Sequence, residues 1–417
     1  MLQVSSVELG PVTVVPTRVE DLTSVDLAHW FALFAAQPGP ANPFLSPTWV
    51  VGWYRHYVEQ ADRQLLFIRH RVTQQLLGVA PLYYQKVALA GLPLAKRLLP
   101  VGSGASELVL ELTGVLADPA HVRDVMRALT AVTLRSDAHW CEASFAPEQG
   151  WFEPEWVFET GRAVSFYEQR RARACVILHL ADSWEQTRAN LKRNVKESIR
   201  RSQNRVKKAG RSFRIRRLEY DALDGAAVDR FLTLHRARAG AEQAGVHHPD
   251  VFTAPRARSF LRALLPELGR SGAASIFELE LEGRTCASQV ALHAPGCSYV
   301  YASGFDPEIW QLGPVTLLHA ELIKHAVSRG DKFVNFSPGP NVSKLRWSER
   351  LWVANDFAYG SGGGALRLRY GAFVIASSLL SHARAVTFAG RNARTTQAPS
   401  SILPEPPEKP ASHALPL

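Results

Sequence analysis

The chain has 417 residues, an apolar fraction of 46% and a formal net charge of +10. This length allows two domains with a sizeable core, and the apolar fraction is that of a globular protein. The positive charge predicts an anionic partner, such as cofactor phosphates, RNA or a membrane surface. The four cysteines form no CxxC pair, so we expect reduced and mostly buried thiols. The sequence shows neither a secretory signal nor an apolar run of the ~20 residues that span a membrane, so a cytoplasmic protein is expected.

The first half of the chain alternates helical and strand patterns after an extended lead-in over residues 1–20. Ser46 is expected to cap a helix with Pro47 at its first position, where proline fits because its missing N–H costs nothing. The other expected elements are a helix at 21–34, strands at 65–69 and 76–84, a loop at 88–104, a strand at 106–112, a helix at 119–134 and a strand at 139–145. These elements predict a first domain over residues 21–170.

A second cycle of elements starts near Ala174, and we place the domain boundary between about 165 and 174. The expected elements are a strand at 175–180, a long helix capped by Asp182 or Ser183, helices at 224–241 and 259–268, and strands at 276–281, 284–292 and 298–303. A three-strand meander followed by a helix and another strand is the order of a GNAT core. The sequence therefore predicts an α/β (α+β) fold of two tandem GNAT-like domains, each a mixed, mostly antiparallel sheet flanked by helices, with the second domain over residues 171–360.

The stretch from Ser298 to Trp347 carries the most informative pattern. A strand at 298–303 leads through a turn-rich loop to Gly313 and Pro314, after which apolar residues recur at helical spacing. Gly330 fits the position just past the helix end, and a second strand is expected at 332–336. The first turn of a helix presents N–H groups to anions, so this loop is either a phosphate site or an ordinary connection.

Basic residues are densest between Arg188 and Arg217. Leu191, Val195, Ile199 and Val206 form an apolar stripe, and lysines and arginines occupy the rest of the surface. This stretch is either a dock for an anionic partner, such as tRNA, a phosphorylated carrier or CoA phosphate, or a solvated helix face. A peripheral membrane contact is a further option. Residues 361–393 are expected to form an amphipathic basic segment, and 394–417 a disordered tail.

Several common reaction types lack their sequence signatures. The histidines show no HExxH or other metal spacing, and His319 and His325 read as plain helix residues. There is no GxSxG elbow, Walker-type phosphate loop or cysteine nucleophile motif. We therefore expect no metal and no permanently bound cofactor, and direct group transfer is the chemistry that remains.

Three segments resemble a known family. YASGFDPE (301–308), LGPVTLLHAELIKHA (312–326) and NFSPGPNVSKLRW (335–347) are similar to the C-terminal half of GNAT-like acyltransferases, in particular the BioF2-like or cellulose-biosynthesis-type acetyltransferases. NPFLSPTWVVGWY (42–54) and LLGVAPLYYQK (76–86) resemble the N-terminal half of the same family. The chain departs from the family pattern at Asn335, where Asp is usual, and at Ser343, where Tyr is usual.

The resemblance implies an acyl-CoA-dependent N-acyltransferase, an acetyltransferase in the simplest case, with acetyl-CoA or another acyl-CoA as co-substrate and a small-molecule or lipid-linked amine as acceptor. Polysaccharide or cell-envelope biosynthesis is the implied setting. The expected catalytic residues are Tyr301, Asp306, Glu308 and Lys344. The expected acyl-CoA-binding residues are Ser303, Gly304, Gln311, Gly313, Pro314, Val315 and Thr316. The expected acceptor-site residues are Gln289, Asn335, Ser337 and Trp347.

Two other functions stay open at this point. The family is related to Fem-type aminoacyltransferases, so a transferase that uses aminoacyl-tRNA is one alternative; nucleic acid is otherwise not expected as a partner. The second alternative is a non-catalytic GNAT-like binding module, which the departures at Asn335 and Ser343 would permit.

Overall fold

The structure is a computed structural model that describes residues 7–89, 91–104, 111–112, 114–145, 164–208, 212–239 and 250–395. Within these ranges, one continuous 14-stranded mixed sheet runs through both halves of the chain. In sheet order its strands are β1 (Val7–Leu9), β2 (Val12–Thr17), β3 (Arg63–His70), β4 (Leu76–Leu89), β5 (Leu92–Pro100), β7 (Trp140–Phe145), β14 (Leu351–Gly360), β8 (Phe166–His179), β13 (Phe333–Pro338), β12 (Cys297–Phe305), β11 (Arg284–Ala294), β10 (Ala274–Leu281) and β9 (Phe213–Leu218), and β6 (Leu116–Ala117) pairs with β4.

Helices flank this sheet. They are α1 (Ser24–Ala35), α2 (Pro47–Tyr57), α3 (Val122–Leu134), α5 (Trp184–Asn190), α6 (Arg193–Lys208), α7 (Gly225–Ala239), α8 (Pro255–Arg270), α9 (Pro314–Ser328), α10 (Val342–Leu345) and α11 (Gly364–Thr395). Short 3₁₀ turns are η1 (Val19–Asp21), η2 (Pro43–Leu45), η3 (Gln60–Asp62), η5 (Tyr220–Ala222) and η6 (Pro307–Leu312). The predicted fold class, a mixed α/β GNAT-like architecture, is confirmed.

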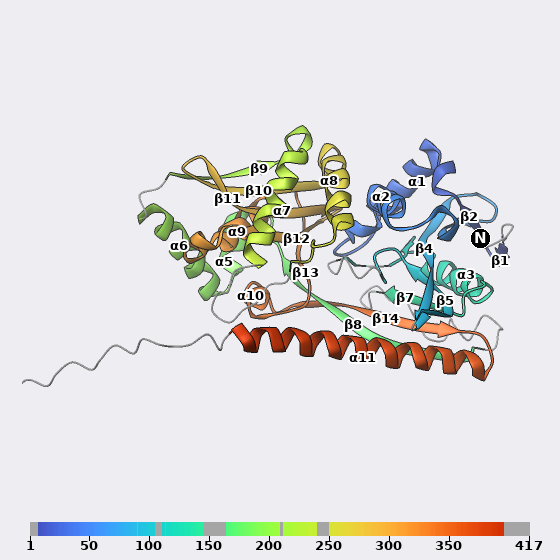
Figure 1. Ribbon diagram of the computed structural model, residues 1–417. Helices are drawn as coiled ribbons and strands as arrows, with labels where there is room; N and C mark the ends of the chain where they lie inside the picture. Colours follow the sequence, from blue (N-terminus) through green and yellow to red (C-terminus); the bar gives the residue numbers. More distant parts are fainter. Residues whose placement is uncertain are drawn as a thin grey trace, which may run out of the picture.

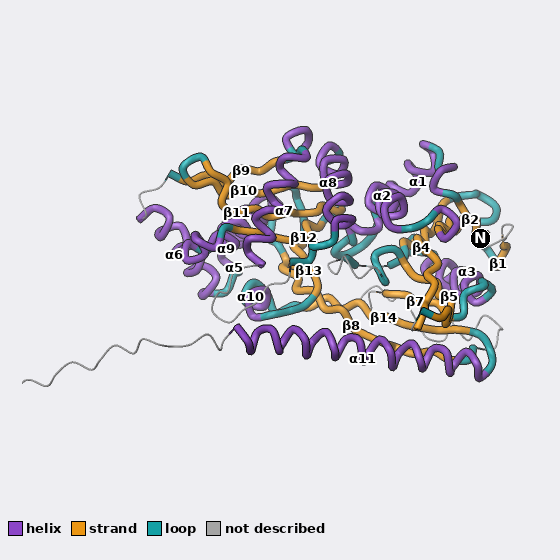
Figure 2. Tube along the Cα trace, in the orientation of Figure 1, coloured by secondary structure: helices purple, strands orange, loops and turns teal. Residues whose placement is uncertain are grey.

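The two halves meet at the long strands β8 and β14. Figure 1 shows both strands running from one half toward the other, and Figures 1 and 2 show α11 lying alongside them. β14 pairs antiparallel with β7 of the first half and with β8, which in turn pairs with β13. The predicted domain boundary at 165–174 falls inside β8, and it stays a prediction.

Two apolar clusters cover opposite sides of the C-terminal part of the sheet. One cluster joins α2, α7 and α8 to Tyr299 and Tyr301 of β12, so it also connects the two halves. The other contains the apolar stripe of α6 and the inner face of α9. The four predicted stripe residues, Leu191, Val195, Ile199 and Val206, are all buried there. The sheet therefore separates the α6–α9 side from the side that faces the first half.

Local sequence signals located several elements correctly. Ser46 caps α2 by accepting a hydrogen bond from the Trp49 N–H at 3.4 Å. The meander appears as β10, β11 and β12, α9 begins at Pro314, and Gly330 has a φ of +78° just past its end. The four cysteines are buried free thiols, as expected.

Three local predictions were wrong or incomplete. Residues 88–104 contain β5, which folds back on β4 after a turn in which Gly91 has a φ of +82°. The predicted long helix is split into α5, capped by Ser183, and α6, because Leu191 takes an extended conformation and is buried. β9 and β14 had not been predicted. The strand expected at 106–112 lies mostly outside the described residues, and so does the tail from 396.

None of the described helices is both long enough and apolar enough to span a lipid bilayer.

Candidate functional site

Two parallel strands, β12 and β13, separate after three paired positions. The pairs are Cys297 with Phe333, Ser298 with Val334 and Tyr299 with Asn335. β12 then continues along β11 and β13 along β8, with no further pair between them among the described residues. Backbone groups that face such a gap need another hydrogen-bonding partner. This opening is the candidate functional site.

Lys344 reaches back from α10 to the end of β13. Its Nζ donates to the Pro338 carbonyl at 2.7 Å, to Ser337 Oγ at 3.2 Å and to the Ser337 carbonyl at 3.3 Å. Ser337 is buried with a φ of +63°, a left-handed conformation that is costly for a residue with a side chain. Its N–H donates to Asn335 Oδ1 at 2.9 Å, which holds the turn in place. Asn335, Ser337 and Lys344 are therefore brought together by one strained turn.

The charge of this corner is positive. Burial lowers the pKa of Lys344 to about 8. The charge of Arg238 also lowers it, whereas the Cys175 thiol acts in the opposite direction. Burial also lowers the pKa of Arg346, and its Nη2 is buried without a hydrogen-bond partner among the described residues. A desolvated cation with unused donors is suited to an anion or to an oxygen on which negative charge develops.

His319 of α9 lies beneath the opening. Its Nδ1 is 2.6 Å from Oε1 of the buried Gln289, and its ring packs edge-on against Phe336 and Trp347. Desolvation lowers the pKa of His319 to about 3, and the charges of Arg238, Lys344 and Arg346 contribute. The imidazole is therefore neutral at pH 7. Trp347, expected to be core or pocket wall, is 3% exposed.

Ser303 and Gly304 of β12 face α7. The Arg238 guanidinium donates to Ser303 Oγ at 2.9 Å and to the Ser303 carbonyl at 3.0 Å. A Cβ atom at Gly304 would overlap the backbone of His235, so the glycine permits close packing of strand on helix. This contact assigns Gly304 a packing role in the structure, and its role in acyl-CoA binding stays a prediction.

The predicted proton-transfer residues lie in different environments. Tyr301 is 2% exposed in the core between the halves, and its hydroxyl has no partner among the described residues. Asp306 caps η6 by accepting from the Glu308 N–H at 3.0 Å and forms an ion pair with Arg284 at 2.9 Å. Glu308 is exposed. Asp306 thus already has a structural function, and only Tyr301 of these three is buried.

The start of α9 is more closed than the sequence suggested. Gly313 has a φ of +70°, and a Cβ atom there would overlap Ser202 Oγ of α6. The N–H groups of Thr316 and Leu317 both donate to the Gly313 carbonyl, at 3.1 and 3.4 Å. Pro314 has no N–H. Of the N–H groups in this first turn, at Val315, Thr316 and Leu317, only that of Val315 is left without a bond to the described residues.

Helix α6 packs beside this loop. Arg205 of α6 donates from Nη1 to the carbonyl of Gln311, just before Gly313, at 2.7 Å. Arg200, Lys207 and Lys208 are exposed, and no ion pair joins them to any described residue. The predicted basic stretch and the predicted phosphate loop therefore lie next to each other.

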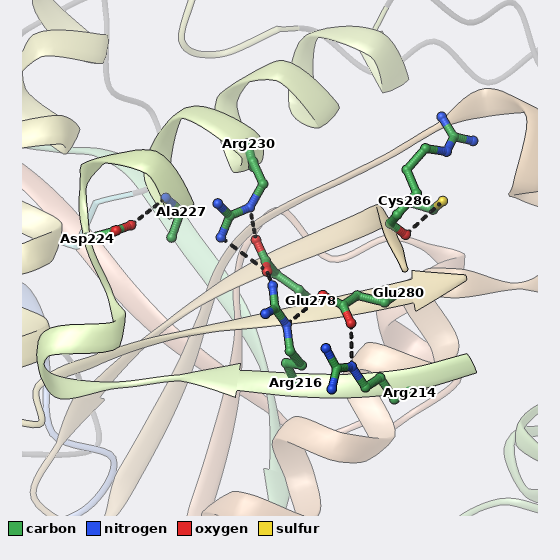
Figure 3. Close-up of polar contacts among 9 residues, drawn as sticks. Arg214, Arg216, Asp224, Ala227, Arg230, Glu278, Glu280 and Cys286 are labelled. Carbon is green, nitrogen blue, oxygen red and sulfur yellow. Dashed lines mark hydrogen bonds and ion pairs between the residues drawn. The ribbon is translucent and has the colours of Figure 1, made fainter. Parts of the chain in front are cut away.

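The second part of the basic stretch is neutralised. Figure 3 shows the side chains of Arg214 and Arg216 on β9 pointing to Glu280 and Glu278 of β10. Glu278 is fully buried and also accepts from Arg230 of α7 at 2.8 Å. These arginines compensate buried carboxylates, which are costly when unpaired. Among the described residues of 188–217, most of the exposed positive charge without an acidic partner therefore lies on α6.

The fold also assembles a group that no sequence spacing indicated. Ligand atoms of Glu219, His293 and His325 lie within 4.8 Å of one another. Both nitrogens of His293 already contact serine hydroxyls, Ser275 Oγ at 2.8 Å and Ser298 Oγ at 2.9 Å. Burial lowers the pKa of both histidines, and the charges of nearby arginines lower it further. The same positive charges would repel a metal dication.

Sequence reasoning missed three side chains around the opening. Arg238 and Arg346 had not been selected, and His319 had been interpreted as a plain helix residue. They come from α7, the segment after α10, and α9, so no local spacing links them. Arg346 lies within the quoted NFSPGPNVSKLRW segment, which was the one available signal.

Comparison with known proteins agrees with this geometry. Residues 193–345 match the family model described as an acetyltransferase (GNAT) domain. This segment is a GNAT-like domain. It contains β12, β13, α9, Lys344 and most of the opening between the strands.

Solved structures extend the similarity beyond the GNAT-like domain. FemX superposes with a TM-score of 0.54 at 11% identity, covering 79% of this chain and 95% of FemX. A protein of unknown function from Bacteroides thetaiotaomicron VPI-5482 gives a TM-score of 0.51 at 14% identity, covering 81% of this chain and 98% of that chain. A tandem GNAT protein from the clavulanic acid biosynthesis pathway gives 0.42 at 13% identity, covering 84% and 99%. At these identities the first two show a shared fold. No curated protein sequence matches.

Proposed function

We propose that the protein is an acyl-CoA-dependent N-acyltransferase whose GNAT-like domain transfers an acyl group from the CoA thioester to an amine. The observation that carries the proposal is the opening between β12 and β13, which ends at the desolvated Lys344. Unpaired strand edges suit an extended ligand with amide groups, such as the arm that carries a CoA thioester.

The residues around the opening support direct transfer. The attacking amine needs alignment with the thioester carbonyl, and the carbonyl oxygen needs a donor as negative charge develops on it. Lys344 and Arg346 supply positive charge at the end of β13. On the α6 side, the Val315 N–H, Arg205 and the exposed cations of α6 form a surface for the CoA phosphates. Acyl-CoA would thus enter from the α6–α9 side.

A transferase that uses aminoacyl-tRNA is the second candidate. The observation that favours it is the exposed positive face of α6, which a tRNA backbone would also fit. The fold shared with FemX is compatible with either function, because a fold hosts many activities. The cytoplasmic location and a role in polysaccharide or cell-envelope biosynthesis stay predictions from the sequence.

Calorimetry with the full chain separates these candidates. We expect acetyl-CoA, or a longer acyl-CoA, to bind with a one-to-one stoichiometry, and thiol release to follow when an amine acceptor is added. Uncharged tRNA serves as the second ligand. Binding of tRNA without any heat from acetyl-, malonyl- or longer acyl-CoA would favour the aminoacyl-tRNA reading. If neither ligand binds, the protein is not a transferase of either kind.

A further inference from the structure

Glu111 is a buried carboxyl group in the contact between the two halves. It is 1% exposed, and neither of its oxygens has a hydrogen-bond partner among the described residues. The next residue, Leu112, is held by a hydrogen bond from Asn42 Nδ2 to its carbonyl at 3.1 Å. The carboxyl group therefore has a defined place, and no hydrogen bond or ion pair to its oxygens is found within the described part of the chain.

The neighbouring guanidinium does not neutralise Glu111. Arg173 of β8 directs its Nη1 to the backbone carbonyl of Glu111 at 3.3 Å, and its Nε pairs with Asp356 of β14 at 3.1 Å. Burial raises the pKa of Glu111 to about 8, while Trp53 and Arg173 act in the opposite direction. A buried polar group without a hydrogen-bond partner costs free energy whether or not it is charged, so a carboxyl group retained there needs another explanation.

Three further buried polar atoms around Glu111 also lack partners among the described residues. They are Trp49 Nε1 and Trp53 Nε1 of α2, and the Tyr301 hydroxyl of β12. The three side chains are at most 2% exposed, and the rings of Trp49 and Tyr301 are 5.8 Å apart. The Trp53 side chain is close enough to Glu111 to lower the pKa of the carboxyl group as a hydrogen-bond donor, although no bond between them meets the full geometry of a hydrogen bond. Glu111 in turn contributes to raising the pKa of Tyr301 after burial. The unpaired groups thus form one cluster from both halves.

This cluster has the chemistry of an ammonium site. A carboxylate pairs with an ammonium ion, and aromatic rings attract cations through their faces. The phenol oxygen can accept another N–H bond. Because the four side chains are almost fully buried, the group that reaches them must be slender. An unbranched chain that ends in a primary amine fits these limits better than an amine on a sugar ring.

The cluster lies on the correct side for an acceptor. Tyr301 belongs to β12, one edge of the opening, and its side chain faces the first half. Helices α6 and α9, where acyl-CoA is proposed to bind, pack on the other side of the sheet. Acyl-CoA and the amine acceptor would therefore reach the opening from opposite faces of the sheet.

We propose that Glu111, with Trp49, Trp53 and Tyr301, binds the primary ammonium group of an unbranched acceptor and takes up its proton. This inference rests on the proposed acyltransfer. The Glu111 carboxylate becomes a carboxylic acid, and the free amine attacks the thioester carbon. The C–N bond forms, the C–S bond breaks, and the CoA thiolate leaves with the second amine proton.

The test compares two ligands of the same shape, n-butylamine and n-butanol, by quenching of tryptophan fluorescence at pH 9. The full chain is used as wild type, Glu111→Gln and Glu142→Gln. The control is matched because Glu142 is also a carboxylate beside a tryptophan, with Trp140 Nε1 at 3.1 Å, but it already pairs with Arg97 at 2.7 Å. Glucosamine is a third ligand that tests the demand for a slender chain.

In the wild type and in Glu142→Gln, n-butylamine should quench at a concentration at least about tenfold lower than n-butanol or glucosamine. In Glu111→Gln this preference should disappear, while acetyl-CoA binding stays unchanged. Equal quenching midpoints for n-butylamine and n-butanol in the wild type would overturn the proposal. This outcome does not depend on whether a variant folds. Retention of the preference in Glu111→Gln would do the same. If the wild type shows the preference for n-butylamine but does not bind acetyl-CoA, the proposed function is wrong while the amine site is supported.

Discussion

Single residues at the opening carry the proposed chemistry. Lys344 is held by three oxygens of a strained turn and is partly desolvated, whereas Lys332 is an exposed lysine that pairs with Asp182 at 3.1 Å. The two lysines belong to the same domain and differ in environment. They therefore allow the charge at the opening to be tested against an ordinary surface charge.

Lys344→Ala should lower the rate of thiol release about 100-fold or more, the usual cost of removing one donor to a developing oxyanion. Lys332→Ala should leave the rate unchanged. Both melting temperatures should stay within a few degrees of wild type, because neither side chain fills the core. A large thermal loss in Lys344→Ala with unchanged turnover of the folded fraction would make Lys344 a structural residue.

Gly313 has to be a glycine for two separate reasons, its positive φ and its contact with Ser202. Gly313→Ala should therefore destabilise the protein by more than the about 1–2 kcal/mol of a left-handed alanine. Gly330→Ala is the matched control at the other end of α9, since it has a φ of +78° and open space around its Cβ position. Chemical denaturation of both variants gives the difference. Equal losses would show that the Ser202 contact adjusts without cost.

Glu111 should make stability depend on pH. Its pKa is raised from an ordinary value of 4.5 to about 8, so the folded state prefers the protonated form. This stabilisation is fully present below pH 4.5 and is lost as the pH rises through 8. Glu111→Gln should thus melt progressively higher than wild type between pH 5 and 9. The charged and titratable neighbours are Arg173, Asp356, Tyr83, Tyr299 and Tyr301. A constant difference in melting temperature over this range would contradict the assignment.

At the scale of elements, α6 combines a buried apolar stripe with an exposed cationic face next to the loop before α9. Lys192, just before α6, and Lys196 within it are less available than the sequence suggested. Lys192 contacts the Leu345 carbonyl and Glu349, and Lys196 donates to the Ala189 carbonyl at 3.0 Å. The charges to reverse are therefore those of Arg200, Lys207 and Lys208, which form no ion pair with any described residue.

Arg200→Glu, Lys207→Glu and Lys208→Glu together should weaken acyl-CoA binding, and the loss should shrink as salt rises because exposed charges are screened. The control reverses Arg55, Arg135 and Arg270, which are equally exposed but lie on α2, after α3 and on α8. Titration of both variants with acetyl-CoA at low and high salt measures the effect. Unchanged affinity in the α6 variant would identify its cationic face as a solvated surface.

At the scale of the whole molecule, α11 packs against the sheet near the junction of the halves. Leu366 and Tyr370 are buried, Tyr370 stacks on Phe166 with ring centroids 4.4 Å apart, and Trp140 lies 5.5 Å from Tyr370. The helix therefore covers residues of β7 and β8.

Truncation after Arg394 should leave the melting temperature and acetyl-CoA affinity within error. Truncation after Gly363 removes α11 and should cost several kcal/mol, about 1.5–3 for each large apolar side chain that loses its cover. Thermal denaturation of the two truncated chains beside wild type checks both outcomes. A loss of several degrees in the shorter truncation would show that residues beyond 394 dock on the core.

Much of the local structure could be predicted from the sequence because it depends on neighbours in the chain. The cap at Ser46, the helix start at Pro314 and the α6 stripe follow from backbone chemistry and the helical period. The Ser298–Trp347 stretch likewise contained Ser337, Lys344 and Trp347, which the structure brings to one corner. Local signals gave no support to β14, whose pairing partners lie far away in the chain.

Only the tertiary structure decided how charges and unpaired groups meet. It neutralised the arginines of β9 with acids of β10, placed Ser202 against Gly313, and set Arg238, His319 and Arg346 around one opening. It also buried Glu111 among side chains of α2 and β12. These contacts join residues that are far apart in the chain, such as Arg216 with Glu278 and Ser202 with Gly313, so no periodicity encodes them. The sequence determined which residues the GNAT-like domain contains, and the packing of the two halves decided which of them are left with a charge or a hydrogen bond to offer a ligand.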